Sequence, residues 1–207
     1  MYDRFSKVGG AALLVGSVVA IVDQILLQLG NGERDFTNPV NIAAQWASLP
    51  ITLLIVFGLP ALVTRLAGRA PVLALLGSAG VALGFLVYGF AIALIDAAVL
   101  PYLAAHHFPV SQPPPGMFIA LIGGGIGEIA GAILLGVAAF RSGAVPRVAA
   151  GLLVGSGVVY AIGLALPGWV GTIGVVALAA GLAICGFWLV RSGTAGTAAV
   201  TPAPAEA

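Results

Sequence analysis

Charged side chains are scarce in this sequence. They make up 7% of the 207 residues, whereas about a quarter of an average soluble domain is charged. Hydrophobic residues make up 60% of the chain, and the mean hydropathy is +1.14. A water-soluble fold of this length needs far more polar side chains to cover its surface. The composition therefore excludes a soluble globular domain and predicts that a lipid bilayer surrounds most of the chain.

The sequence also lacks the residues on which several kinds of chemistry depend. Its single cysteine, Cys185, stands in an apolar run and has no partner for an internal disulfide. No CxxC, GxSxG, HExxH or Walker pattern occurs. The apolar runs contain no histidine to ligate a membrane haem, and the net charge of +1 provides no electrostatic basis for binding nucleic acid. We therefore expect no metal site, no cofactor and no nucleic-acid partner.

Long apolar runs are abundant instead. Six of them are long enough to cross about 30 Å of hydrocarbon at about 1.5 Å per residue. Their predicted limits are 8–29, 46–64, 72–100, 117–140, 147–166 and 169–190. The chain is therefore predicted to be all-α, with a polytopic transmembrane bundle of six helices over residues 1–191. The segment 192–207, rich in Ala, Thr, Pro and Gly, is predicted to be a disordered cytoplasmic tail.

Lysine and arginine predict the orientation of these helices. Seven of the eight basic residues precede the first run, follow the last, or lie in the second or fourth connection: Arg4, Lys7, Arg65, Arg69, Arg141, Arg147 and Arg191. Because cytoplasmic loops are enriched in such residues, both chain ends are predicted to be cytoplasmic. The lack of organelle or retention signals and the Ala- and Gly-rich composition favour the plasma membrane of a bacterium.

Glycine is the second abundant feature, with 30 residues. In a bilayer, glycine lets helix backbones approach closely, often at four-residue spacing. Such spacing occurs in the third, fourth and fifth runs, at Gly80 and Gly84, at Gly123, Gly127 and Gly131, and at Gly151 and Gly155. We interpret the last pair as background in a glycine-rich chain. Three glycines in register predict that the fourth run is the central helix.

Three carboxylates fall inside the predicted spans: Asp23, Asp96 and Glu128. No Lys or Arg lies within the spans to pair with them, so we expect them to be protonated, hydrogen-bonded to neutral groups or exposed to a wet cavity. Counting along the helices places Asp23 about 9 Å and Asp96 about 6 Å from the outer ends, and Glu128 about 16 Å deep. Depth makes Glu128 the first catalytic candidate and Asp23 the second, while Asp96 lies close enough to the interface to reach water instead.

Polar and aromatic side chains gather in the predicted outer half of the bundle. They are Gln24, Gln28, Trp46, Tyr88, Tyr102, Tyr160 and Trp169. We interpret them as the lining of a cavity that opens outward and binds a lipophilic small molecule, with membrane lipid as the other partner. For the aromatic residues near helix ends, Trp46, Tyr102 and Trp169, the alternative is the aromatic belt at the membrane surface.

Three functions are compatible with these residues. In the first, a neutral carboxylic acid protonates a lipophilic substrate in a dry pocket and a second carboxylate removes the final proton. Glu128 and Asp23 would be acid and base in either order, with Asp96 and Tyr160 in support. In the second, the carboxylates relay protons or bind a cation in a small transporter or channel, with a homodimer supplying the remaining spans. In the third, they only hydrogen-bond across helices in a non-catalytic membrane subunit.

A further interpretation of the chain rests on its small size, its six predicted spans and its three intramembrane carboxylates, Asp23, Asp96 and Glu128. It resembles the integral-membrane terpene cyclases of meroterpenoid and indole-terpenoid pathways, over the whole chain at the level of size, span count and acidic character. The resemblance implies a cofactor-free, acid-catalysed cyclisation of an isoprenoid, started and finished by paired intramembrane carboxylates. No motif carries these roles to particular positions, so Glu128 and Asp23 are assigned by depth. A closed-bottom apolar cavity that joins them would favour catalysis, and a polar file reaching the cytoplasmic side would favour transport.

Overall fold

The computed structural model describes residues 2–29, 38–106, 115–164, 166 and 168–195, and within these residues it is helical without strands. The α-helices are α1 (Tyr2–Leu29), α2 (Pro39–Leu66), α3 (Pro71–Gly84), α4 (Leu100–Ala105), α5 (Pro115–Ser142), α6 (Arg147–Gly163) and α7 (Gly168–Ala195). Two π-helical segments, η1 (Phe85–Ile92) and η2 (Ile95–Val99), continue α3 toward α4. The all-α prediction is confirmed.

Five stretches in the described part of the chain are long and apolar enough to cross a bilayer. They are Arg4–Gln28, Pro39–Leu66, Pro71–Leu103, Gly116–Ser142 and Trp169–Ser192. The helix α6 is apolar but has 17 residues, which corresponds to about 25 Å. The protein is therefore a polytopic α-helical membrane protein, in which five of the six predicted spans have full length.

Several helices extend beyond the predicted limits. The helix α2 begins at Pro39 rather than at residue 46, because Asn38 caps it with a side chain that accepts a hydrogen bond from the Val40 N–H at 2.9 Å. Pro39 fits the first turn, where its missing N–H has no intrahelical partner to lose. At the other end of the chain, α7 continues to Ala195 and so includes residues 192–195 of the predicted tail. The remainder of that tail lies outside the described residues.

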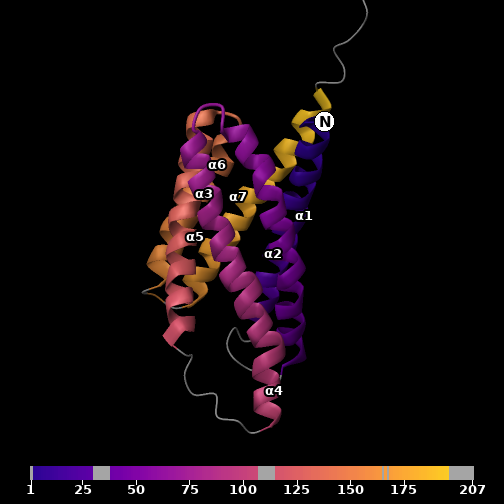
Figure 1. The fold of residues 1–207 in the computed structure, drawn as a ribbon, viewed down its shortest axis with the longest axis vertical. Helices are drawn as coiled ribbons and strands as arrows, with labels where there is room; N and C mark the ends of the chain where they lie inside the picture. The colour runs from indigo at the N-terminus through magenta and orange to yellow at the C-terminus, as the bar shows by residue number, and fades with distance from the viewer. Residues whose placement is uncertain (1, 30–37, 107–114, 165, 167, 196–207) are drawn as a thin grey trace, which may run out of the picture.

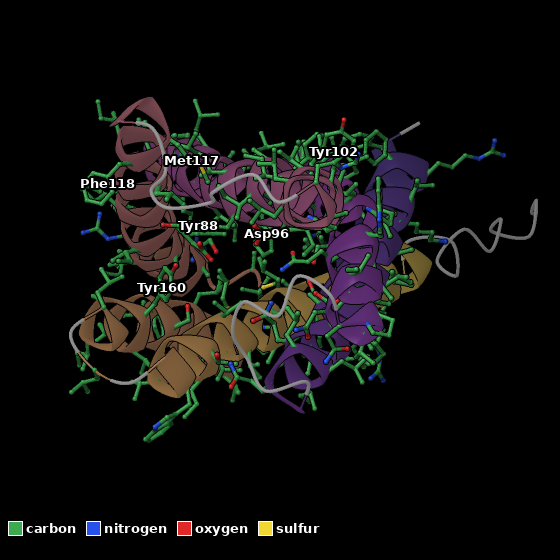
Figure 2. The ribbon with its side chains drawn as sticks, turned by 90° about the horizontal axis from the view of Figure 1, so that it is seen from below. Tyr88, Asp96, Tyr102, Met117, Phe118 and Tyr160 are labelled. Carbon is green, nitrogen blue, oxygen red and sulfur yellow. The ribbon has the colours of Figure 1, made fainter. Side chains whose placement is uncertain are left out.

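The helices form a closed ring, seen from the side in Figure 1 and end-on in Figure 2. Along the chain, α1 packs on α2, α2 on α3 and the π-helical segments, α3 on α5, α5 on α6 and α6 on α7, and α7 returns to pack on α1. The most extensive contacts are those of α1 with α7 and of α3 with α5. This arrangement differs from the central position predicted for the fourth run, because α5 is one member of the ring.

The contact between α3 and α5 depends on facing glycines. A Cβ atom built on Gly80 would lie 2.5 Å from the Gly127 carbonyl oxygen and 2.8 Å from the Gly131 Cα. A Cβ on Gly131 would collide in turn with the backbone of α3 at Gly80 and Val81. The predicted packing role of these glycines is confirmed, since any side chain here would push the two backbones apart.

Other glycines of the same spacing do not pack in this way. Around Gly123 and Gly155 a Cβ atom would meet nothing within 4 Å, and at Gly151 the nearest atom is 3.9 Å away. The interpretation of Gly151 and Gly155 as background is therefore confirmed. Gly123 does not take part in the register that we predicted for the fourth run.

One end of the ring carries the seven basic residues that the structure describes, and we call it the basic end. The N-terminus, the α2–α3 connection and the α5–α6 connection all lie there, at the top of Figure 1. Fully buried leucines occupy the interior of the adjoining half: Leu13, Leu62, Leu66, Leu135, Leu153, Leu182 and Leu189. We call these residues the leucine layer, and they belong to one packed hydrophobic core cluster. The opposite half of the ring, which we call the far half, holds the cavity described below.

Candidate functional site

A cavity of about 250 Å³ lies in the far half of the ring. Its wall contains residues from α1, α2, α3 with its π-helical continuation, α5, α6 and α7. Seven of the thirteen lining residues are polar: Gln24, Gln45, Ser48, Tyr88, Asp96, Glu128 and Tyr160. Figure 2, which looks along the helices from the far end, shows Tyr88, Asp96 and Tyr160 around the space that the ring encloses.

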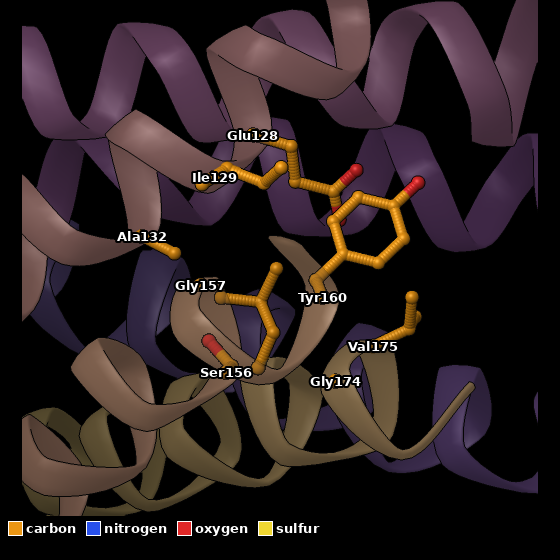
Figure 3. Close-up of a pocket in the computed structure, with 9 residues that line it drawn as sticks. Glu128, Ile129, Ala132, Ser156, Gly157, Tyr160, Gly174 and Val175 are labelled. Atoms are coloured by element: carbon orange, nitrogen blue, oxygen red, sulfur yellow. The ribbon is translucent and has the colours of Figure 1, made fainter. Parts of the chain in front are cut away.

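Glu128 is the innermost carboxyl group of the cavity. Its residue is only 6% exposed, and it faces α3 at Gly84, where a Cβ atom would collide with the Glu128 side chain. Glycine at position 84 therefore leaves the room that the carboxyl group needs. On the side away from α3, Figure 3 shows the Glu128 carboxyl beside the Tyr160 ring, at a small pocket of about 10 Å³ that Ser156 also lines.

Two neighbouring phenol groups lie in the cavity wall. The Tyr88 hydroxyl donates to the Leu121 carbonyl oxygen of α5 at 2.7 Å. The Tyr160 side chain is also within hydrogen-bonding reach of Tyr88. Because the single hydroxyl proton of Tyr88 is used toward Leu121, we infer that Tyr160 donates to the Tyr88 oxygen. This inferred chain would join α6 through η1 to α5 beside Glu128.

Asp96 reaches the cavity because of the π-helical segments. Gly84, Tyr88, Ile92 and Asp96 recur at every fourth position, and all four line the cavity. An α-helix has about 3.6 residues per turn, and the i→i+5 bonds of a π-helix make its turns wider. Because α-helical and π-helical turns alternate here, residues spaced by four stay on one face of the helix from Gly84 to Asp96. Segments of π-helix are frequent at functional sites, and here they bring Asp96 into the same cavity as Glu128.

Asp23 lies outside this cavity. It is 5% exposed, and its Oδ2 accepts a hydrogen bond from the Ser48 hydroxyl of α2 at 2.8 Å. On its other side it lines a groove between α1 and α2. The cavity thus brings Glu128 together with Asp96, while Asp23 contacts it through Ser48.

The other residues predicted to bind substrate divide into two groups. Gln24, Tyr88 and Tyr160 line the cavity. Gln28 instead donates to the Thr172 hydroxyl at 2.7 Å and ties α1 to α7. The three remaining aromatic residues are exposed on the surface and line none of the described pockets: Trp46, Tyr102 and Trp169 are 48, 59 and 60% exposed. Their positions fit the aromatic belt.

Sequence reasoning missed several lining residues. Gln45 and Ser48 are three positions apart on α2 and so share one helix face. This pair of polar residues near the start of an apolar run was a signal that could have been used. Phe85 and Gly89 had no such signal, because η1 is apolar throughout these positions apart from Tyr88.

The site is interpreted from its own chemistry. Comparison with protein-family models, curated proteins and solved structures found no match to this chain. Among the described residues, no group of three or more His, Cys, Asp or Glu is placed to hold a metal ion. The cavity offers two carboxyl groups, two phenols, two amides and one hydroxyl, and the buried leucine layer lies between it and the basic end.

Proposed function

We propose that the protein is a membrane-embedded acid–base catalyst whose cavity accepts a lipophilic substrate with a small polar group. The observation that carries the proposal is the placement of Glu128 and Asp96 in one cavity that ends at an apolar layer. Two carboxyl groups in different surroundings can divide the roles of proton donor and proton acceptor. Such a reaction needs no cofactor.

Position distinguishes the two roles. Glu128 is buried at the inner end of the cavity. In its protonated form it can act there on a substrate that is shielded from water. It transfers its proton to an alkene or epoxide, and the faces of Phe85, Tyr88 and Tyr160 stabilise the cation that forms. Asp96 then accepts a proton from the rearranged cation. Return of that proton to Glu128 completes the cycle, so substrate and product have the same composition.

Cyclisation of a linear isoprenoid is the specific reaction that we propose. It is the activity implied by the resemblance to membrane terpene cyclases, with Asp96 in the place that depth alone assigned to Asp23. The polar lining favours a substrate that carries oxygen, because a pure hydrocarbon would leave the amides of Gln24 and Gln45 without partners. The cavity of about 250 Å³ lies just below the range of about 300–1,000 Å³ for most ligand pockets, which favours a small substrate.

A second candidate is proton or cation transport. Carboxyl, amide and hydroxyl oxygens in one cavity are also suitable ligands for a cation. The leucine layer disfavours this function, since an ion would have to cross it to reach the basic end. We therefore prefer catalysis and keep transport as the alternative to be tested.

Product analysis by mass spectrometry tests the proposal. Membranes containing the protein are incubated with linear and epoxidised isoprenoids, beside membranes with Glu128→Gln, Asp96→Asn or the control Gln28→Leu, whose amide lies outside the cavity. We expect an isomeric product of unchanged mass, retained in the control and reduced about 100-fold or more in the two carboxyl variants. Unchanged substrates with the wild type, or full activity in Glu128→Gln, would contradict the proposal, and proton flux in liposomes would then be measured.

We further propose that α6 is the sixth span, that both ends are cytoplasmic and that the membrane is a bacterial plasma membrane. The helix α5 ends at the basic end, and α7 must start at the opposite end to finish there. The chain between them has to return across the ring, and α6 is the segment that does so. The gathering of basic residues at one end supports the cytoplasmic assignment.

A further inference from the structure

A groove of about 470 Å³ runs between α1 and α2 on the outer surface of the ring. Its walls include Val19, Val22 and Leu26 of α1 and Val40 of α2, which are between 41 and 50% exposed. These residues belong to apolar stretches that are long enough to cross a bilayer, and we infer from this that the groove faces lipid. An apolar chain is the natural occupant of such a groove, because water is excluded from it.

The floor of the groove carries one polar group. Of the nine residues that line it, Asp23 alone has a polar side chain. Its Oδ2 is taken by the Ser48 hydroxyl, and Ser48 also lines the central cavity. The Asp23–Ser48 pair is therefore the wall between the groove and the cavity.

The position of Asp23 restricts the headgroup of the occupant. It lies six residues before the end of α1, or about 9 Å from that end. A phosphate would be repelled by a carboxylate and would be costly to desolvate at this depth. A hydroxyl group is small and uncharged, and it can both donate to a carboxylate and accept from a carboxylic acid. Charge and depth together select an alcohol.

We propose that this groove is a docking site for a single-chain lipid alcohol, which lies along α1 and α2 from the bilayer side with its hydroxyl on Asp23. The groove volume falls within the range of about 300–1,000 Å³ that is usual for ligand sites. The docking site also suggests the class of substrate, an isoprenoid alcohol that arrives from the bilayer. This part of the inference rests on the proposed function. The docking itself does not depend on turnover.

Photo-crosslinking tests the docking. The purified full chain in phosphatidylcholine vesicles is exposed to a diazirine analogue of farnesol and to the corresponding diazirine hydrocarbon without the hydroxyl, and labelled residues are mapped by mass spectrometry. In the wild type we expect labels on the groove residues of α1 and α2. The alcohol should label them about two- to tenfold more than the hydrocarbon, which is the effect of one hydrogen bond.

Three variants make the test specific. Asp23→Leu should remove the preference for the alcohol, and Ser48 retains the Ala44 carbonyl oxygen at 3.2 Å as an acceptor. Ala43→Phe fills the groove from an exposed position and should reduce labelling by both probes. Ala161→Phe is the matched control, since it adds the same ring at an exposed alanine of α6 and should change nothing.

The outcomes separate docking from catalysis. Glu128→Gln should lose turnover and keep groove labelling. Equal labelling by both probes in the wild type, or unchanged labelling in Ala43→Phe, would overturn the docking site even if the protein turns over isoprenoids. Groove labelling that shows the expected preference, with no turnover of any isoprenoid, would instead overturn the proposed function and leave the docking site standing.

Discussion

Tyr88 is the middle member of the inferred hydrogen-bonded chain from Tyr160 to the Leu121 carbonyl, so removing its hydroxyl should break two bonds. Removing the Tyr160 hydroxyl breaks one, because Tyr88 keeps its bond to Leu121. Hydrogen bonds between membrane helices contribute about 0.6 kcal/mol on average. We expect Tyr160→Phe to lower the free energy of unfolding by about that amount and Tyr88→Phe by about twice as much, measured by denaturation in bicelles.

The double variant provides the control for this prediction. With Tyr88 already replaced by Phe, the Tyr160 hydroxyl has lost its acceptor, so Tyr160→Phe should cost little more. The double variant should therefore match Tyr88→Phe alone. Additive losses would mean that the two phenols make separate hydrogen bonds and do not form a chain.

At the scale of elements, the α3–α5 contact is a place where one added side chain should strongly lower the stability of the fold. A Cβ atom on Gly80 would meet backbone atoms of Gly127 and Gly131, which cannot move aside as a flexible side chain can. We expect Gly80→Val to lower the free energy of unfolding by about 1–3 kcal/mol or more. Thermal unfolding in detergent measures the loss.

The matched control for this contact is Gly155→Val on α6. It introduces the same side chain at a helical glycine that has nothing within 4 Å of its Cβ position. The control should unfold close to the wild-type temperature. If both variants lose equal stability, helix propensity would account for the effect, and the close approach of α3 and α5 would not.

At the scale of the whole molecule, the orientation can be measured with single cysteines. The native Cys185 is fully buried and should not react in intact membranes. We expect a membrane-impermeant maleimide to label Gly116→Cys and Leu166→Cys from outside intact cells, and Gly68→Cys only after the cells are made permeable. All three positions are exposed in the structure.

Each position reports on a different part of the topology. Gly68 and Gly116 are separated by the long third segment, and labelling of both from the same side would contradict its crossing. Leu166 follows α6, so labelling from the cytoplasm alone would show that α6 does not span the membrane. The reverse pattern at all three positions would place both chain ends outside.

The sequence by itself determined the class of the molecule and the positions of its helices. Apolar length is a local property, and a bilayer requires each crossing segment to satisfy its own backbone hydrogen bonds, so composition and run length predict helices without knowledge of their neighbours. The same reasoning identified Gly80, Gly127 and Gly131 as packing residues and Glu128 as the deepest carboxyl group. Helix ends were less predictable, and the Asn38 cap that starts α2 early was overlooked.

Only the tertiary structure decided which side chains meet. Depth along a helix can be counted from the sequence, but the direction in which a side chain points depends on how the whole helix is rotated in the ring. That rotation turns Asp23 toward Ser48 and Gln28 toward Thr172. No local sequence pattern predicted the π-helical turns. These turns place Asp96 on the same helix face as Tyr88, and so in the cavity with Glu128. Rotation and turn width are set by packing between helices, and for that reason they emerge only when all of the helices are in place.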